Sequence, residues 1–219
     1  MTSTVRIVVA LCLVVITAAS VRAQRNPPVK RADLPIGIGI ARVLPTPGLI
    51  LRFYRPPAMG EMPGDYAPSD VVTFGPGLPS VAIAEAPPWL VPEHLKMDYE
   101  LFQLRVLTLT PQWVEVIGNS TTGETRWEDR SQVEVASWQE FLLSVPSVEA
   151  FDAEANPVRA RPLDAAPILS TARAALPPLA VQGDWLRVAT GDLADRIQPE
   201  GWIRWRRGDR LLVLYNPFS

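Results

Sequence analysis

Apolar and polar residues alternate with a period of two over several short stretches, a pattern that is typical of half-buried β-strands. The clearest stretch is 113–117, which reads Trp-Val-Glu-Val-Ile, and 185–188 repeats the pattern as Trp-Leu-Arg-Val. Glycine, proline and asparagine separate such stretches, as expected of strands joined by turns. The predicted strands are 49–54, 100–110, 113–117, 124–127, 158–161, 178–181, 185–188, 201–205 and 210–215. The sequence therefore predicts an all-β fold of short strands.

One segment has a helical pattern instead. Ser137 and Glu140 match a capping box, in which the hydroxyl accepts the N3 amide proton and the carboxylate bonds back to the first amide. Apolar side chains follow at positions 138, 141, 142 and 145, which is the spacing of one helical face. We therefore expect a short helix over 138–145 that ends at Pro146.

The N-terminus has the three parts of a secretory signal peptide. Arg6 precedes a charge-free apolar run over 7–16, and Val21-Arg22-Ala23 is an A-x-A-like cleavage site. The run is shorter than the roughly 20 residues that a membrane-spanning helix needs, although an uncleaved N-terminal anchor is the alternative interpretation. Cleavage removes Cys12, the one cysteine, and leaves no disulfide or thiolate. We expect a signal peptide at 1–23 and an exported protein, periplasmic or extracellular, with no membrane span after cleavage.

Prolines are concentrated before and within the first half of the remaining chain. Residues 24–48 are predicted to form an extended, weakly ordered lead-in. Residues 56–92 contain nine prolines among 37 residues, a density that disfavours both helices and central strands. We expect a long Pro-rich insertion at 56–92 rather than a core element.

Three short motifs occur twice in the same order, which indicates an internal duplication. They are W-apolar-charged-V at 113–116 and 185–188, G-x-x-R-W at 123–127 and 201–205, and Arg-Pro at 55–56 and 161–162. The predicted organisation is a first unit at 49–146, which includes the Pro-rich insertion and the helix, and a second unit at 147–219.

Alternation also sorts the residues of each strand into an inner and an outer face, because successive side chains point to opposite sides. The aliphatic side is expected to face the interior, which places the G-x-x-R-W tryptophan inside. The predicted structural core comprises Val114, Val116, Trp127, Leu186, Val188, Ile203 and Trp205. Trp113 and Trp185, which occur in both units, are also interpreted as structural.

The second unit resembles a bacterial SH3-like domain. Val158-Arg-Ala-Arg-Pro162 fits the first strand of that family, Trp185-Leu-Arg-Val188 a middle strand, and Gly201-Trp-Ile203 the turn and strand that follow. The resemblance implies a small, strongly bent five-stranded barrel, and the duplication extends it to the first unit. The first unit departs from the family by its insertion and by Glu124 in place of an aromatic residue. The expected fold is two SH3-like barrels in tandem.

Candidate catalytic chemistry is sparse. With His94 and Cys12 as the only histidine and cysteine, the sequence predicts no metal site, no cofactor and no Cys–His catalytic pair. His94 follows Pro92 and is interpreted as a surface loop residue. Glu128 and Asp129 are adjacent on a strand, so their carboxylates face opposite ways. The chain is predicted not to be an enzyme; a carboxylate-based polysaccharide hydrolase is the remaining catalytic alternative.

Charge divides the chain and disfavours nucleic acid as a partner. Residues 24–156 carry a net charge of −7 and residues 157–219 a net charge of +3, which is too weakly basic for a nucleic-acid surface. Opposite charges on adjoining units favour their docking.

Trp202 has no aromatic counterpart in the first unit and is predicted to point outward beside Arg204. Together with Arg187 and Arg159 it forms the candidate ligand-binding site, since an indole and guanidinium groups can stack on rings and pair with carboxylates. The alternative is that Trp202 packs against the first unit or the Pro-rich insertion.

SH3-like units outside the cytoplasm resemble cell-wall or peptide-binding attachments. The resemblance therefore implies a non-catalytic binding protein for a cell-wall peptide or an envelope protein. A structural or inhibitory partner that acts through 56–92 is the alternative, because proline-rich segments dock readily.

Overall fold

Antiparallel strands are the main regular structure of the computed structural model, which describes residues 33–58, 60–191 and 199–218. The predicted all-β fold is confirmed, and one α-helix, α1 (Trp138–Ser144), occurs among the described residues. The predicted signal peptide, and the lead-in as far as residue 32, lie outside these residues. Within the described part of the chain, no helix combines the length and the apolar character needed to cross a membrane.

The first unit is a nine-stranded antiparallel sheet with the order β4-β3-β2-β8-β7-β6-β1-β9, in which β5 pairs with β6 beside this path. Its strands are β1 (Gly39–Val43), β2 (Ile50–Tyr54), β3 (Asp70–Pro76), β4 (Val81–Glu85), β5 (His94–Lys96), β6 (Leu101–Leu109), β7 (Trp113–Asn119), β8 (Glu124–Asp129) and β9 (Glu134–Ser137). Three short 3-10 helices, η2 (Pro63–Asp65), η3 (Met97–Tyr99) and η4 (Arg130–Gln132), lie in its described connections.

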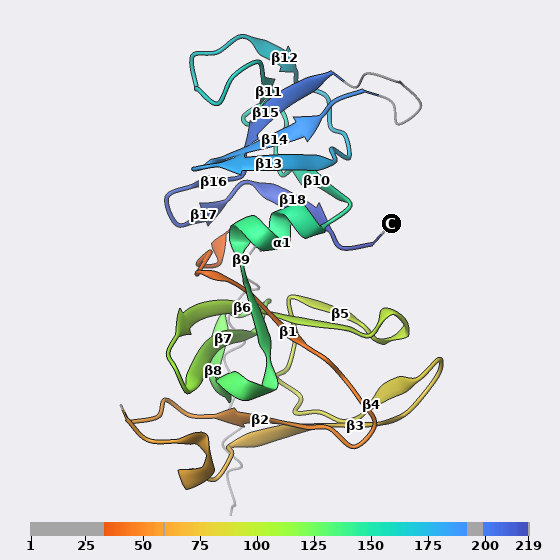
Figure 1. The fold of residues 1–219 in the computed structure, drawn as a ribbon, viewed down its shortest axis with the longest axis vertical. Helices are drawn as coiled ribbons and strands as arrows, with labels where there is room; N and C mark the ends of the chain where they lie inside the picture. The colour runs from red at the N-terminus through yellow and green to blue at the C-terminus, as the bar shows by residue number, and fades with distance from the viewer. Residues whose placement is uncertain (1–32, 59, 192–198, 219) are drawn as a thin grey trace, which may run out of the picture.

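The second unit has a five-stranded sheet with the order β12-β11-β15-β14-β13, and two further pairs, β10–β18 and β16–β17. Its strands are β10 (Ser147–Ala150), β11 (Val158–Arg159), β12 (Ile168–Ser170), β13 (Pro178–Gln182), β14 (Trp185–Ala189), β15 (Glu200–Arg204), β16 (Arg206–Arg207), β17 (Arg210–Leu211) and β18 (Val213–Asn216). The two units lie end to end along the long axis of the molecule, with α1 between them (Figure 1).

The same strand path occurs in both units. In the first unit the sheet runs β3-β2-β8-β7-β6, and in the second it runs β12-β11-β15-β14-β13, with the strands taken from the chain in the same relative order. The β1–β9 pair of the first unit corresponds to the β10–β18 pair of the second. Strand β1 also pairs with β6, and in the second unit a bridge between Val148 and Leu176 likewise joins β10 to the segment before β13. Strands β4 and β5 have no counterpart. This repeated topology supports a duplication.

Strand pairing defines which residues of the two units correspond. Trp113 lies opposite Asp129 in the β7–β8 pair, and Trp185 lies opposite Arg204 in the β14–β15 pair. Counting back from these pairs, Trp127 corresponds to Trp202. The alignment of the two G-x-x-R-W motifs is therefore wrong by three residues.

Trp127 and Trp205 consequently do not occupy equivalent interiors. Trp205 is 2% exposed, whereas Trp127 is only partly buried, on the outer face of β8 opposite Glu115. The inward position beside it belongs to Glu128, which pairs with Val114. The G-x-x-R-W motif gave the wrong alignment because the connection between β7 and β8 differs in length from that between β14 and β15. The pairing of the strands, not the spacing of a motif, decides which face of the sheet a side chain lies on.

The interior contains two hydrophobic clusters. One fills the first unit and includes the predicted core residues Val114 and Val116. The other, which includes the predicted Leu186, Val188, Ile203 and Trp205, extends beyond the second unit. It also contains side chains of α1 and of the first unit, namely Trp138, Phe141, Leu142, Ile36 and Ile40. The two units therefore share one core through α1.

The lead-in is more ordered than the sequence indicated. Strand β1 lies within 24–48 and pairs with both β6 and β9, and its residues Ala41 and Val43 are fully buried. Gly39 makes this packing possible, because a Cβ atom there would lie 2.0 Å from the Ala136 carbonyl oxygen. The Ile-Gly alternation marks close approach between strands rather than loose structure.

The Pro-rich segment 56–92 is also not a simple loop. It contains β3 and β4, and Val72, Phe74 and Val81 are buried in the core of the first unit. Its prolines lie outside these strands or, as with Pro76, at a strand end, and β4 is an edge strand. Proline is tolerated at such positions because it interrupts no central ladder.

Candidate functional site

The structure brings the four predicted ligand-binding residues to one face of the second unit. Trp202 in β15 lies directly between Arg159 in β11 and Arg187 in β14. Directly paired residues share a face of the sheet, and Arg204, two residues on, faces the same way beside Trp185. We call these five residues, Arg159, Trp185, Arg187, Trp202 and Arg204, the Trp–Arg face. Its opposite side carries Leu186, Val188 and Ile203, which belong to the core.

Arg204 is held tightly on this face. Its guanidinium carbon lies 4.5 Å from the centre of the Trp185 ring, and Nη2 lies 2.8 Å from Oδ2 of Asp164. A second carboxylate, that of Asp184, lies 3.6 Å from Nη1. Cation–π contact and two ion pairs fix this side chain, so its role on the face is to cover Trp185.

Arg187 and Trp202 are more accessible. The Arg187 side chain is 42% exposed and reaches Oε2 of Glu200 at 3.4 Å, a distance typical of a weak surface pair. Trp202 is partly exposed, and Arg159 donates to the Ala166 carbonyl oxygen at 2.8 Å. A ligand carboxylate can replace Glu200 at Arg187 while its apolar part rests on the Trp202 ring.

The position of β15 disfavours the alternative in which Trp202 packs on the first unit. Strands β11, β14 and β15 lie beyond α1 and β18 from the first unit (Figure 1). The Trp–Arg face is thus carried by the part of the second unit that is remote from β1–β9.

The equivalent face of the first unit has the same tryptophans and opposite charges. Trp113 and Trp127 stand where Trp185 and Trp202 stand, while Glu115 and Asp129 replace the two arginines of β14 and β15. This face is covered by the chain itself: Trp113 Nε1 donates to the Glu61 carbonyl oxygen at 2.8 Å, and the Tyr66 ring packs edge-on at 5.7 Å.

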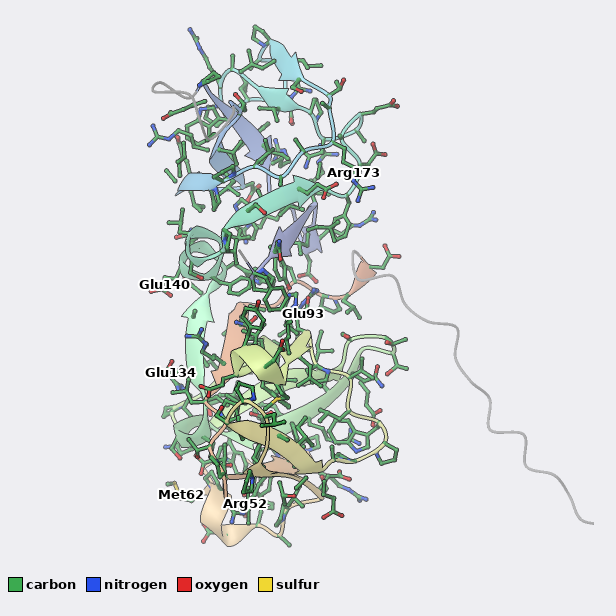
Figure 2. The ribbon with its side chains drawn as sticks, turned by 90° about the vertical axis from the view of Figure 1, so that its right-hand side faces the viewer. Arg52, Met62, Glu93, Glu134, Glu140 and Arg173 are labelled. Atoms are coloured by element: carbon green, nitrogen blue, oxygen red, sulfur yellow. The ribbon has the colours of Figure 1, made fainter. Side chains whose placement is uncertain are left out.

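A second polar group, absent from the sequence prediction, lies between the units. Glu93 and Arg105 are buried, and Nη2 of Arg105 lies 3.0 Å from Oε1 of Glu93. The Tyr215 hydroxyl of β18 donates to the same oxygen, and the His94 ring packs against Tyr215 with 5.1 Å between centres. Glu93 lies between the two units in Figure 2. We call these four residues the inter-unit polar cluster.

His94 was predicted to be a surface loop residue, and this is wrong. It begins β5 and is partly buried against the second unit, because β5 pairs with β6 and faces β18. No spacing rule could reveal Glu93 or His94 as inter-unit contacts, since Tyr215 lies more than 100 residues further along the chain. Within residues 33–58, 60–191 and 199–218, no three or more His, Cys, Asp or Glu side chains are grouped to hold a metal ion.

Glu128 is the most unusual titratable residue. It is fully buried on the inner face of β8, and neither carboxylate oxygen has a hydrogen-bond partner in the part of the chain that the structure describes. Desolvation raises its pKa to about 8, so the group is mainly protonated at neutral pH. Asp129 faces the other way and caps η4 through Ser131, which excludes acid–base cooperation between the adjacent pair.

One cavity does hold two carboxylates. It has a volume of about 360 Å³ and lies between α1 and the sheet, with Glu134 of β9 and Glu140 of α1 in its lining. Hydrogen bonds from the Ser137 backbone and hydroxyl lower the pKa of Glu140, so this group is ionised at neutral pH. A glycosidase needs one carboxyl that stays protonated, and Glu140 does not fit that role.

Comparison with known proteins adds no relative: no family model matches this chain, and neither a curated protein nor a solved structure matches it.

Proposed function

We propose that the protein is an exported, non-catalytic binding protein built from two SH3-like units. Its Trp–Arg face binds a carboxylate-bearing peptide of the cell wall or of an envelope protein. The observation that carries this proposal is the row Arg159–Trp202–Arg187 on the outer face of one sheet. Aromatic and arginine side chains dominate binding energy at interfaces, because they combine apolar area with strong directed hydrogen bonds.

The two-unit part of the proposal is supported by the repeated path of antiparallel strands, and the SH3-like part rests on the motifs at 158–162, 185–188 and 201–203. In the second unit, the strands that carry the family motifs, β11, β14 and β15, are neighbours in one five-stranded sheet. Export rests on the signal-peptide pattern of residues 1–23.

The first unit indicates how a ligand would sit. There the Trp113 side of the sheet is covered by residues 61–66, a short proline-containing segment of the same chain. The second unit presents the corresponding tryptophans with arginines in place of the acids. A peptide that binds the Trp–Arg face is therefore expected to carry acidic residues beside an apolar or proline-containing stretch.

Binding of the purified protein to isolated cell wall, and separately to the soluble peptides released from it, tests the proposal. We expect Trp202→Ala and Arg187→Gln each to weaken binding by about tenfold, the effect of losing about 1.4 kcal/mol. Trp127→Ala, at the corresponding position of the first unit, and Arg207→Gln, an exposed arginine outside the face, are the matched controls. Equal binding by the Trp202→Ala variant and the wild type in both arms would remove this site.

A second candidate function uses the β3–β4 hairpin. Leu78, at its tip, is 94% exposed, so an apolar contact with a protein partner is possible there. Deleting 56–92 cannot test this, since the deletion removes core residues. Leu78→Ser leaves the core intact, and loss of a partner by this variant but not by Trp202→Ala would favour the second function.

A further inference from the structure

The cavity beside α1 is a separate candidate binding site, and its floor is a row of polar side chains. Arg42 in β1 pairs directly with Gln103 in β6 on one side and with Glu134 in β9 on the other. Directly paired residues share a face, so the three side chains stand together under α1. All three line the cavity of about 360 Å³, which is within the size range of small-molecule sites.

Gln103 is the residue that indicates a ligand. It is 5% exposed, and its Oε1 atom has no hydrogen-bond partner in the described part of the chain. A buried acceptor without a donor is costly, so such an atom normally has a partner. Gln103 also lines the cavity, so a rotation of its amide brings Oε1 within reach of a donor placed there.

Charge around this amide has a specific arrangement. Arg42 and Glu134 are neighbours across the ladder, yet neither forms an ion pair with another described residue. Glu140 lies on the α1 side, and its Oε2 atom is fixed by the cap at Ser137. Figure 2 shows Glu134 and Glu140 on the same side of the molecule. The site thus offers one cation next to acidic groups and an amide oxygen.

We propose that this cavity binds the zwitterionic headgroup of a free α-amino acid. The ligand carboxylate pairs with the Arg42 guanidinium, and its ammonium group lies between Glu134 and Glu140 and donates to Gln103 Oε1 once the amide has rotated toward the cavity. An α-amino acid carries its ammonium and carboxylate groups on one carbon, so the two opposite charges lie close enough together to meet oppositely charged side chains of neighbouring strands. Its side chain rests against Ile40 and Phe141, the apolar part of the lining.

The test uses L-alanine as the probe and follows the amide spectrum of the purified protein. We expect saturable shifts for amides of β1, β9 and α1. Ethylamine, which has only the ammonium group, and propionate, which has only the carboxylate, are each expected to bind about tenfold more weakly.

Variants assign the two charges. Arg42→Gln and Glu134→Gln replace exposed side chains, so both are expected to fold and to lose about tenfold in alanine affinity. Arg52→Gln and Glu85→Gln, on strands outside the cavity, are the matched controls, and Trp202→Ala is expected to bind alanine normally. The proposal is overturned if alanine gives no saturable shift, as for a cavity that holds water only. It is also overturned if ethylamine binds as well as alanine, or if Arg42→Gln binds like the wild type.

Discussion

Glu128 occupies in the first unit the inward position that Ile203 occupies in the second. Val114 is the direct cross-strand neighbour of Glu128, and Leu186 is that of Ile203, so the two positions correspond by pairing. The second unit thus buries an aliphatic side chain where the first buries a carboxyl without a described hydrogen-bond partner. This exchange makes the first unit sensitive to substitution and to pH.

Replacing Glu128 by Leu is expected to stabilise the protein. The substitution removes a buried polar group that costs about 1–3 kcal/mol and restores the apolar character found at Ile203. Urea denaturation at pH 8 should show an increase in the free energy of unfolding of that order. Glu85→Gln, on the exposed edge strand β4, should leave it unchanged. A loss of stability in Glu128→Leu would mean that the carboxyl has a structural partner.

The stability of the wild-type protein is expected to fall as the pH rises. The folded pKa of Glu128, about 8, is above the value of 4.5 for an unperturbed Glu, so the folded state binds the extra proton between these values. The contribution of this proton to the free energy of unfolding is fully present below pH 4.5 and is lost as the pH rises through 8. Between pH 5 and pH 8 the slope from this group is about −1.4 kcal/mol per pH unit.

Glu128→Gln provides the control for this pH dependence. The amide does not titrate, so the difference between the wild type and the variant in denaturation midpoints should change steadily with pH. Parallel profiles for the two proteins from pH 5 to pH 8 would show that Glu128 keeps an ordinary pKa in the folded state.

The two tryptophans of the G-x-x-R-W motifs are expected to differ in their contribution to stability. Trp205 is 2% exposed, donates from Nε1 to the Gly183 carbonyl oxygen at 2.9 Å and lies in the shared core. Trp205→Ala should cost about 3–5 kcal/mol. Trp127→Ala, at a partly buried outer position, should cost about 1 kcal/mol. Equal losses of stability for the two variants in thermal denaturation would show that the two tryptophans are structurally equivalent, as the motif spacing suggested.

The two units are expected to unfold in a single transition. Trp138 of α1 donates from Nε1 to the Ile36 carbonyl oxygen at 2.7 Å and packs on Trp205 and Tyr215, so it contacts both units. Trp138→Ala should therefore lower the protection of backbone amides from hydrogen exchange in both β7 and β14. Hydrogen exchange measured strand by strand checks this. Loss of protection in one of the two strands alone would show that the units are independent.

Local patterns were sufficient for part of the fold. Alternation located the two hairpin strand pairs that begin at Trp113 and Trp185, and the Ser137–Glu140 capping box located α1, because both signals depend only on neighbouring residues. Proline density was less informative. It concealed β3 and β4 because the count ignores whether a proline lies inside a strand or beside it.

The candidate sites divide in the same way. Arg159, Arg187 and Trp202 could be grouped from the sequence, since alternation gives their face once the strands are known. The burial of Glu128 could not be predicted from the sequence, because the pairing register decides whether Glu128 or Trp127 points inward. The contact between Glu93 and Tyr215 joins two units and has no local signature.

The first unit differs from the second by the long connection between β3 and β6, which contains β4 and ends with Glu93 and the strand β5. Glu93 and His94 contact Tyr215 on β18, so a part of the first unit that has no counterpart in the second unit binds the second unit. This connection therefore helps to hold the two units together. Shortening it would remove this contact, and the orientation of the Trp–Arg face relative to the α1 cavity would then depend on the packing of α1 between the two units.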